Sequence, residues 1–166
     1  MPPVPPVPPM PLIARRAWLR LVLLPGALAG AQARAQKSPF AQPPPPRHPA
    51  PPAGSDALHA DDYRRHAARH LYDVYPDQVL KGMVRANVYA IVVTETDVDA
   101  RGRVLAVRVL RKPASAHEVT PWVVALIRGA SPLPPPLRLK RARYVDTWLV
   151  DRSGQFQLRT LTEGQR

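Results

Sequence analysis

Residues 87–111, NVYAIVVTETDVDARGRVLAVRVLR, form the stretch of this sequence that decides its fold. Its first part, Asn87–Val98, is rich in valine, isoleucine, tyrosine and threonine and predicts a strand. Arg103–Arg111 predicts the return strand, with Leu105, Val107 and Val109 on one face. Between the strands, an aspartate can bond the backbone two residues on, and Gly102 can adopt a positive φ. The stretch therefore predicts an antiparallel β-hairpin.

A second hairpin is predicted near the C-terminus. Strand Arg143–Val150 is followed by another Asp-x-x-Gly turn at 151–154 and by strand Gln155–Leu158. Between the hairpins, His117–Gly129 predicts a helix whose apolar residues recur every three or four positions. Its expected N-cap, first helical residue and C-terminal glycine are Thr120, Pro121 and Gly129. This order favours a two-layer α+β fold, with a small, mostly antiparallel sheet and helices on one face.

A further helix is predicted upstream of the first hairpin. Asp56–Asp73 has a thin apolar stripe, and its acidic residues precede its basic ones, which suits the helix dipole. Asp62, His66 and His70 fall on one face, so they form either a metal-ligand set or, as we favour, a solvated face with charge pairs. We expect no metal and no other cofactor. Asp77–Val84 predicts a short helical turn or a short helix.

The first 35 residues are predicted to be an export signal. Arg15, Arg16 and Arg20 precede an uncharged run, and small residues follow up to Ala35. This order is typical of a secretory signal, with cleavage after Ala35 or Ala33, and the two adjacent arginines also resemble a twin-arginine signal. The apolar run of 13 residues is shorter than the roughly 20 that span a membrane. Either Met1 or Met10 could be the true start, and the expected location is the periplasm.

A proline-rich segment follows the signal. Residues 36–55 contain eight prolines, and residues 1–52 contain sixteen of the 23 in the chain. Runs of proline exclude regular helices and central strands, so this segment is expected to be a disordered, semi-rigid spacer. It is read either as a tether or as a leader without a selected role. The folded part should therefore begin after about residue 55.

The net charge of +12 is unevenly distributed along the chain. Four of these charges belong to the export signal, which leaves +8 on the mature chain. The densest basic cluster is Arg138, Lys140, Arg141 and Arg143. It could contact anionic surfaces of the cell envelope, or it could be a solvated loop. No aromatic residues lie among these arginines for base stacking, so a nucleic-acid partner is not expected.

An enzyme is the class that the sequence supports least. The predicted domain has one histidine, His117, and its serines lie outside any nucleophile motif. Cysteine is absent, which excludes thiolate metal sites and a cysteine nucleophile. We therefore expect no catalytic residues.

Residues 74–160 resemble the C-terminal domain of TonB-type energy transducers, with residues 161–166 as a tail. The resemblance rests on four features, which are Val74-Tyr75-Pro76, the hairpin ending in Val107–Arg111, the run Gly129–Pro136 and a final strand region. An N-terminal export segment and a proline-rich spacer stand in the same order in that family. Family members, however, keep an uncleaved transmembrane helix, which this chain is predicted to lack.

The resemblance implies a binding module that adds an extended peptide to a sheet edge. Its partner would be a protein of the cell envelope, for example of the outer membrane. The implied contact residues are Tyr75 and Pro76, together with the last strand, Gln155, Phe156, Gln157, Leu158 and Arg159. A free edge there could also pair two copies of the chain, and contact with the membrane would be transient, through the export signal. If that signal is retained instead, the chain would be an anchored energy transducer.

Overall fold

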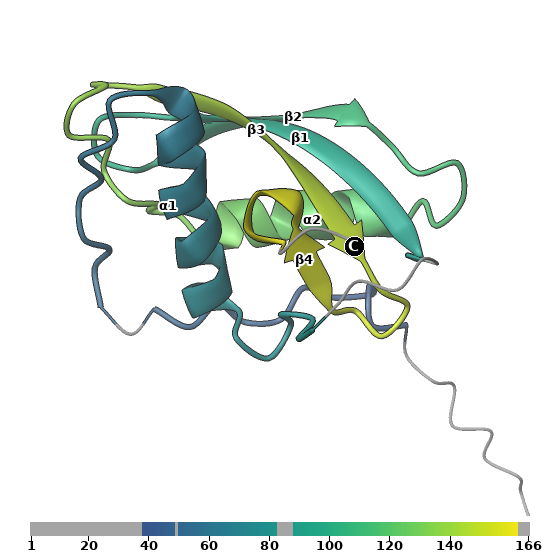
Figure 1. Cartoon of the computed structure of the whole chain (residues 1–166). Helices are drawn as coiled ribbons and strands as arrows, with labels where there is room; N and C mark the ends of the chain where they lie inside the picture. The colour runs from purple at the N-terminus through teal and green to yellow at the C-terminus, as the bar shows by residue number, and fades with distance from the viewer. Residues whose placement is uncertain (1–37, 49, 83–87, 163–166) are drawn as a thin grey trace, which may run out of the picture. The chain divides into compact units, whose positions relative to one another are not determined.

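The computed structural model describes residues 38–48, 50–82 and 88–162, so the predicted export signal and most of the tail lie outside the described residues. Figure 1 shows the elements in chain order. They are α1 (Ala60–Val74), β1 (Ala90–Val98), β2 (Val104–Arg111), α2 (Val119–Gly129), β3 (Ala142–Val150), β4 (Phe156–Leu158) and the 3-10 turn η1 (Arg159–Leu161). Among the described residues, no helix has the length and apolar character needed to cross a membrane.

The four strands form one antiparallel sheet in the order β2-β1-β3-β4. Helix α1 packs on β3, and α2 packs on β2 and β1. Both helices lie on the same side of the sheet (Figure 1). The predicted two-layer α+β fold is therefore confirmed.

The two hairpin turns have the same hydrogen bonds. In the first, the Gly102 N–H donates to the Asp99 carbonyl, and the Asp99 side chain accepts the Arg101 N–H at 2.9 Å. In the second, Gly154 and Asp151 make the corresponding bonds, at 3.1 and 2.9 Å. Both glycines have a positive φ, of 82° and 84°. Both predicted turns are thus confirmed.

The core lies between the helices and the inner face of the sheet. Strand alternation in β1 and β3 places every second side chain inward, as the burial of these strands shows. The α2 stripe faces them, because its apolar residues recur at helical spacing. The largest fully buried side chains include Trp148, Tyr63, Tyr75, Phe156, Leu71, Leu126, Ile127 and Leu133.

Three predicted boundaries are wrong. Helix α1 begins at Ala60 rather than at Asp56, because Ser55 is extended and bridges to Pro136. The described part of 77–84 is a turn and an extended bridge rather than a helix, since Val79 pairs with Phe156. Helix α2 starts at Val119, so the expected cap residue, Thr120, lies inside its first turn.

The described residues of the predicted spacer pack on the domain, which corrects the expectation of a disordered tether. Phe40 is buried, stacks on Tyr89 at 5.6 Å between ring centroids and meets Trp122 edge-on at 5.3 Å. Farther along, the Arg47 N–H donates to the Val74 carbonyl at 2.9 Å. Composition alone does not predict this packing. The prolines have no N–H that must be bonded, so burial of the single aromatic ring of Phe40 is enough to hold the segment on the domain.

We expect Phe40→Ala to lower the free energy of unfolding by about 3 kcal/mol, because a buried aromatic contact is lost. Urea denaturation of the variant and the wild type would measure this. Gln42→Ala, at an exposed position two residues on, should change stability by less than about 0.5 kcal/mol. If Phe40→Ala were as stable as the wild type, the proline-rich segment would not be held on the domain.

Candidate functional site

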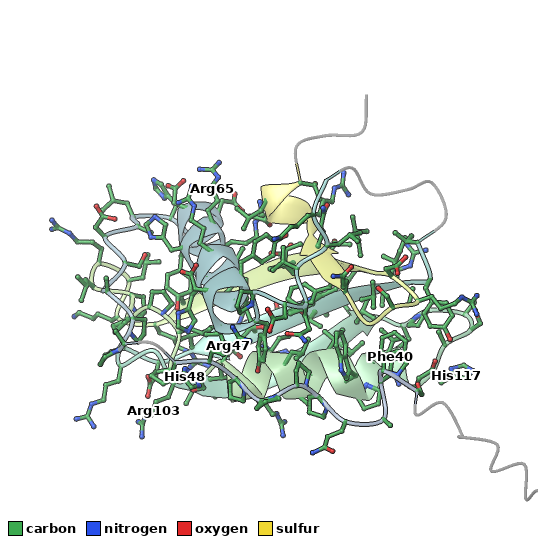
Figure 2. All side chains as sticks on the ribbon, turned by 90° about the horizontal axis from the view of Figure 1, so that it is seen from below. Phe40, Arg47, His48, Arg65, Arg103 and His117 are labelled. Carbon is green, nitrogen blue, oxygen red and sulfur yellow. The ribbon has the colours of Figure 1, made fainter. Side chains whose placement is uncertain are left out.

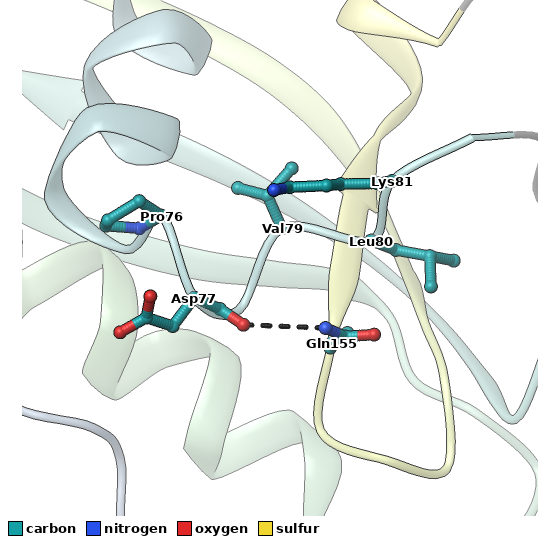
Figure 3. A pocket seen from close by; sticks show the side chains of 6 residues that line it. All are labelled: Pro76, Asp77, Val79, Leu80, Lys81 and Gln155. Atoms are coloured by element: carbon teal, nitrogen blue, oxygen red, sulfur yellow. Dashed lines mark hydrogen bonds between the residues drawn. The ribbon is translucent and has the colours of Figure 1, made fainter.

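Two of the predicted contact regions do meet in the structure. Pro76 and Gln155 line the same shallow pocket of about 400 Å³, with Asp77, Val79, Leu80 and Lys81 (Figure 3). They meet because the segment after α1 runs along β4. The Phe156 N–H donates to the Gln78 carbonyl at 2.7 Å, and the Leu80 N–H donates to the Phe156 carbonyl at 2.9 Å.

The outer edge of β4 is therefore closed, and the expectation of a free edge at Gln155–Arg159 is wrong. Beyond the bonds at Phe156, the Leu158 N–H donates to the Tyr72 hydroxyl at 2.9 Å. The Leu158 carbonyl accepts the N–H of Thr162 at 3.2 Å. The side chains of Phe156 and Leu158 are both fully buried. An incoming strand would have to displace all of these contacts.

The polar residues of the predicted edge hold the covering segment. The Gln157 amide donates to the carbonyls of Leu80 and Gly82, at 2.7 and 2.6 Å. The Gln155 amide reaches the Asp77 carbonyl at 3.5 Å, the dashed line of Figure 3. Arg159 opens the turn η1 and is exposed. Both glutamines thus stabilise the segment after α1 in its place on β4.

Tyr75 belongs to the core rather than to a contact surface. Its side chain is buried, and its hydroxyl donates to the Leu126 carbonyl at 3.0 Å. Burial raises the pKa of this hydroxyl to about 12. The hydroxyl lies so near α2 that a Cβ at Gly129 would be 2.6 Å from it. Gly129 is therefore needed as the last residue of α2.

The basic cluster is divided by the structure. Arg138 and Lys140 are exposed, whereas Arg143 and Arg141 turn to Asp97, at 2.7 and 3.6 Å. Arg108 from β2 also reaches this carboxylate, at 2.9 Å. The hydrogen bond from Arg143, chiefly, keeps the pKa of Asp97 below its usual range. Part of the predicted anionic-surface cluster is thus neutralised within the sheet.

A second buried carboxylate, Asp146, lies on the inner face of β3. Its cross-strand neighbour is Thr94, and its Oδ1 accepts the Thr147 N–H at 2.8 Å. Burial raises the pKa of this carboxyl, which is the opposite of the shift at Asp97. Strand alternation could have indicated that Asp146 points inward, because it stands between Tyr144 and Trp148 in the two-residue period of β3.

The histidines on α1 do not form one site with Asp62. Asp62 pairs with Arg65 at 2.9 Å, and His66 bonds the Ser55 hydroxyl at 2.7 Å. His70 is buried against the Ala130 carbonyl, and its burial lowers its pKa. Across residues 38–48, 50–82 and 88–162, the structure contains no group of three or more potential metal ligands.

The open edge of the sheet is that of β2. Its start is covered, because the Val104 N–H donates to the Ser131 hydroxyl at 3.2 Å and the Leu133 N–H donates to the Gly102 carbonyl at 2.8 Å. From Leu105 to Arg111, no described residue makes a backbone hydrogen bond to the outer edge.

Sequence reasoning missed this edge because two register shifts interrupt the pairing of β1 with β2. The shifts leave Leu105 and Leu110 as the extra residues of β2, with 53% and 56% of their surfaces exposed. The expectation that Leu105 lies on one face with Val107 and Val109 is therefore wrong, because Val107 and Val109 pack against the core and Leu105 is exposed. An insertion of one residue reverses the alternation, and no sequence signal announces it.

Comparison of the chain with models of protein families, with curated proteins and with solved structures finds no match.

We expect Gly129→Ala to destabilise the protein by about 1–3 kcal/mol, because its Cβ would overlap the Tyr75 hydroxyl. Tyr75→Phe removes that oxygen, so the double variant should be less destabilised than the sum of the two single variants. A double-mutant cycle in urea measures this coupling. Strictly additive effects would contradict the close approach of the two residues.

We expect Asp97→Asn and Asp146→Asn to have opposite effects at pH 7. A lowered folded pKa stabilises the protein above the unfolded pKa of about 3.9, and this contribution is lost as the pH falls through the folded value. Asp97→Asn should therefore cost about 2 kcal/mol at pH 7, with a smaller difference below about pH 4. A raised folded pKa has the reverse sign, so Asp146→Asn should be at least as stable as the wild type at pH 7.

Unfolding midpoints of the three proteins between pH 2 and pH 7 would test this pair. The result that contradicts the assignment is a loss of stability at pH 7 that is larger for Asp146→Asn than for Asp97→Asn.

Proposed function

We propose that this chain is an exported binding or scaffolding module of the cell envelope, which takes up an extended peptide by β-strand addition along β2. The observation that carries the proposal is the contrast between the two sheet edges. On the outer edge of β4 the backbone groups are hydrogen-bonded, whereas on the outer edge of β2 from Leu105 to Arg111 none is bonded to a residue that the structure describes. Unpaired edge groups are the template on which an added strand forms its main-chain bonds.

The side chains along β2 indicate the character of the peptide. Leu105 and Leu110 are exposed at the two ends of the strand and offer apolar contacts. Arg111 and Lys112 are exposed at its far end and favour acidic residues in the partner. The two bulges leave Ala106–Val109 as the regular stretch, so pairing would be short. A short pairing favours weak, reversible binding over permanent assembly.

Export and the family resemblance support this proposal from the sequence. The predicted export signal, the proline-rich segment and the resemblance of residues 74–160 to the TonB C-terminal domain are all what a periplasmic binding module would be expected to have. The same resemblance would assign energy transduction if the first 35 residues remained as an anchor. Contact with anionic envelope surfaces through Arg138 and Lys140 is compatible with either case.

A peptide titration would test strand addition directly. The probe is a synthetic heptapeptide that alternates valine with glutamate, added to the full chain while amide hydrogen exchange is followed. We expect exchange to slow at those amides of Ala106–Val109 whose N–H groups point away from β1, because these groups become bonded to the peptide. A control peptide of the same composition with proline at its centre should protect these amides much less, since proline lacks the N–H.

Matched variants would show which part of β2 is used. Leu110→Asp should weaken binding of the acidic peptide by about tenfold, through lost apolar contact and like-charge repulsion. Leu58→Asp, at a leucine outside the sheet that is slightly more exposed than Leu110, should leave binding of the peptide unchanged. Protection at Phe156–Leu158 instead of at β2 would show that the peptide displaces the segment after α1, and would overturn the choice of edge.

A further inference from the structure

One end of the domain combines a basic loop with Leu58 and Leu137, which are the most exposed large apolar side chains among the described residues. Leu58 and Leu137 each have 65% of their surface exposed. Their segments lie side by side, because the Ser55 N–H donates to the Pro135 carbonyl at 2.8 Å and the Leu137 N–H donates to the Ser55 carbonyl at 2.9 Å. The hairpin turn at 99–102 joins the same end through the bond from Leu133 to Gly102. Figure 1 shows this turn, the start of α1 and the loop before β3 together at the left.

The loop before β3 exposes both an apolar side chain and two basic side chains to solvent. Leu139 packs against the core and anchors the loop. Its neighbours Arg138 and Lys140 are exposed, and Lys140 has a φ of 56°, which turns the chain sharply there. Leu137 leans on the backbone of Gly54, where a Cβ would meet its side chain at 2.7 Å. The loop thus holds one leucine and two cations outward on a fixed base.

The charge of this end is positive. Arg101 and Arg103 of the hairpin turn are exposed beside the loop, and Figure 2 places Arg103 at this end. Asp99, in the same turn, pairs with Arg103 at 2.7 Å. Asp61 and Asp62, in the first turn of α1, pair with Arg64 and Arg65 of the same helix at 3.6 and 2.9 Å. Asp56, exposed just before α1, adds one negative charge against the three cations Arg101, Arg138 and Lys140. The cations of the loop, together with Arg101, therefore outnumber the acidic groups of this end that lack an ion pair.

We infer that this end, which we call the leucine-basic end (Leu58, Leu137, Arg138, Lys140, Arg101), docks on an anionic lipid bilayer. Apolar side chains that enter the headgroup region, together with lysine and arginine beside acidic lipids, are the two elements of peripheral membrane binding. A soluble polyanion would use the cations alone and would leave both leucines in water. The combination therefore favours a lipid surface. The inference does not depend on strand addition, because β2 contributes nothing to this end.

Because the chain has no cysteine, one cysteine can report on each position. The full chain is labelled with an environment-sensitive fluorophore at Leu137→Cys, at Leu58→Cys and, as the matched control, at Leu110→Cys on β2. Vesicles of phosphatidylcholine mixed with phosphatidylglycerol are then added. We expect a blue shift at the first two positions and none at the third. Adsorption through the N-terminal segment alone would leave all three labels in water, and that result would overturn the inference.

Charge variants complete the test, with the label kept at residue 137. Arg138→Gln with Lys140→Gln should raise the vesicle concentration at half-maximal shift by about tenfold or more, since each cation near an acidic surface adds to binding. Arg111→Gln with Lys112→Gln removes the same charge at the far end of β2 and should change it by less than about twofold. Pure phosphatidylcholine vesicles should give little shift. Binding to soluble polyphosphate without any blue shift on vesicles would assign the end to soluble anions and overturn the membrane inference.

Discussion

The pairing of β1 with β3 is the constraint on which the rest of this structure depends. Each hairpin is local, but their junction joins Ala90 to Val150 and Val98 to Ala142, far apart along the chain. This pairing places the two central strands beside each other and sends β2 and β4 to the edges. It also aligns the inner faces of both hairpins, so that α1 and α2 cover one continuous apolar surface. Without it, each two-stranded hairpin would be only marginally stable in water.

Each edge of this sheet is managed in a different way. At β4 the chain uses its own segment after α1 as a parallel neighbour and locks it with the amide of Gln157. At β2 it covers only the first residues and then interrupts the strand with two bulges. Bulges and charge are common protection against uncontrolled pairing of an exposed edge. The same features leave a short regular stretch at Ala106–Val109. This stretch is long enough to pair with one peptide strand and too short to favour aggregation with other sheet edges.

Local chemistry made much of the fold predictable from the sequence. The Asp-x-x-Gly turns, the strand composition and the apolar stripe of α2 are each determined within a few residues. Both hairpins and the α+β fold class could therefore be predicted. Contacts between residues far apart in the sequence could not be predicted in this way. Phe40 is an isolated aromatic among prolines, and only the ring stack with Tyr89 shows that it anchors the segment. Gln157 was expected among the partner contacts, but its side-chain amide instead bonds the carbonyls of Leu80 and Gly82 in the segment that covers β4.

The pairing of charged residues also depends on contacts between distant parts of the chain. It determines which cations are available at each of the two proposed surfaces. Asp97 stands two residues before the first hairpin turn in the sequence, yet in the fold it pairs with Arg108 from β2 and with Arg143 from β3. That network fixes Arg143 and Arg108 on the sheet and leaves Arg138 and Lys140 as the loop's available cations. Ser131–Leu133 then lies between the start of β2 and the loop, bonded to Val104 and Gly102. A peptide would thus contact strand β2, and a bilayer would contact the loops of the leucine-basic end, so neither need exclude the other.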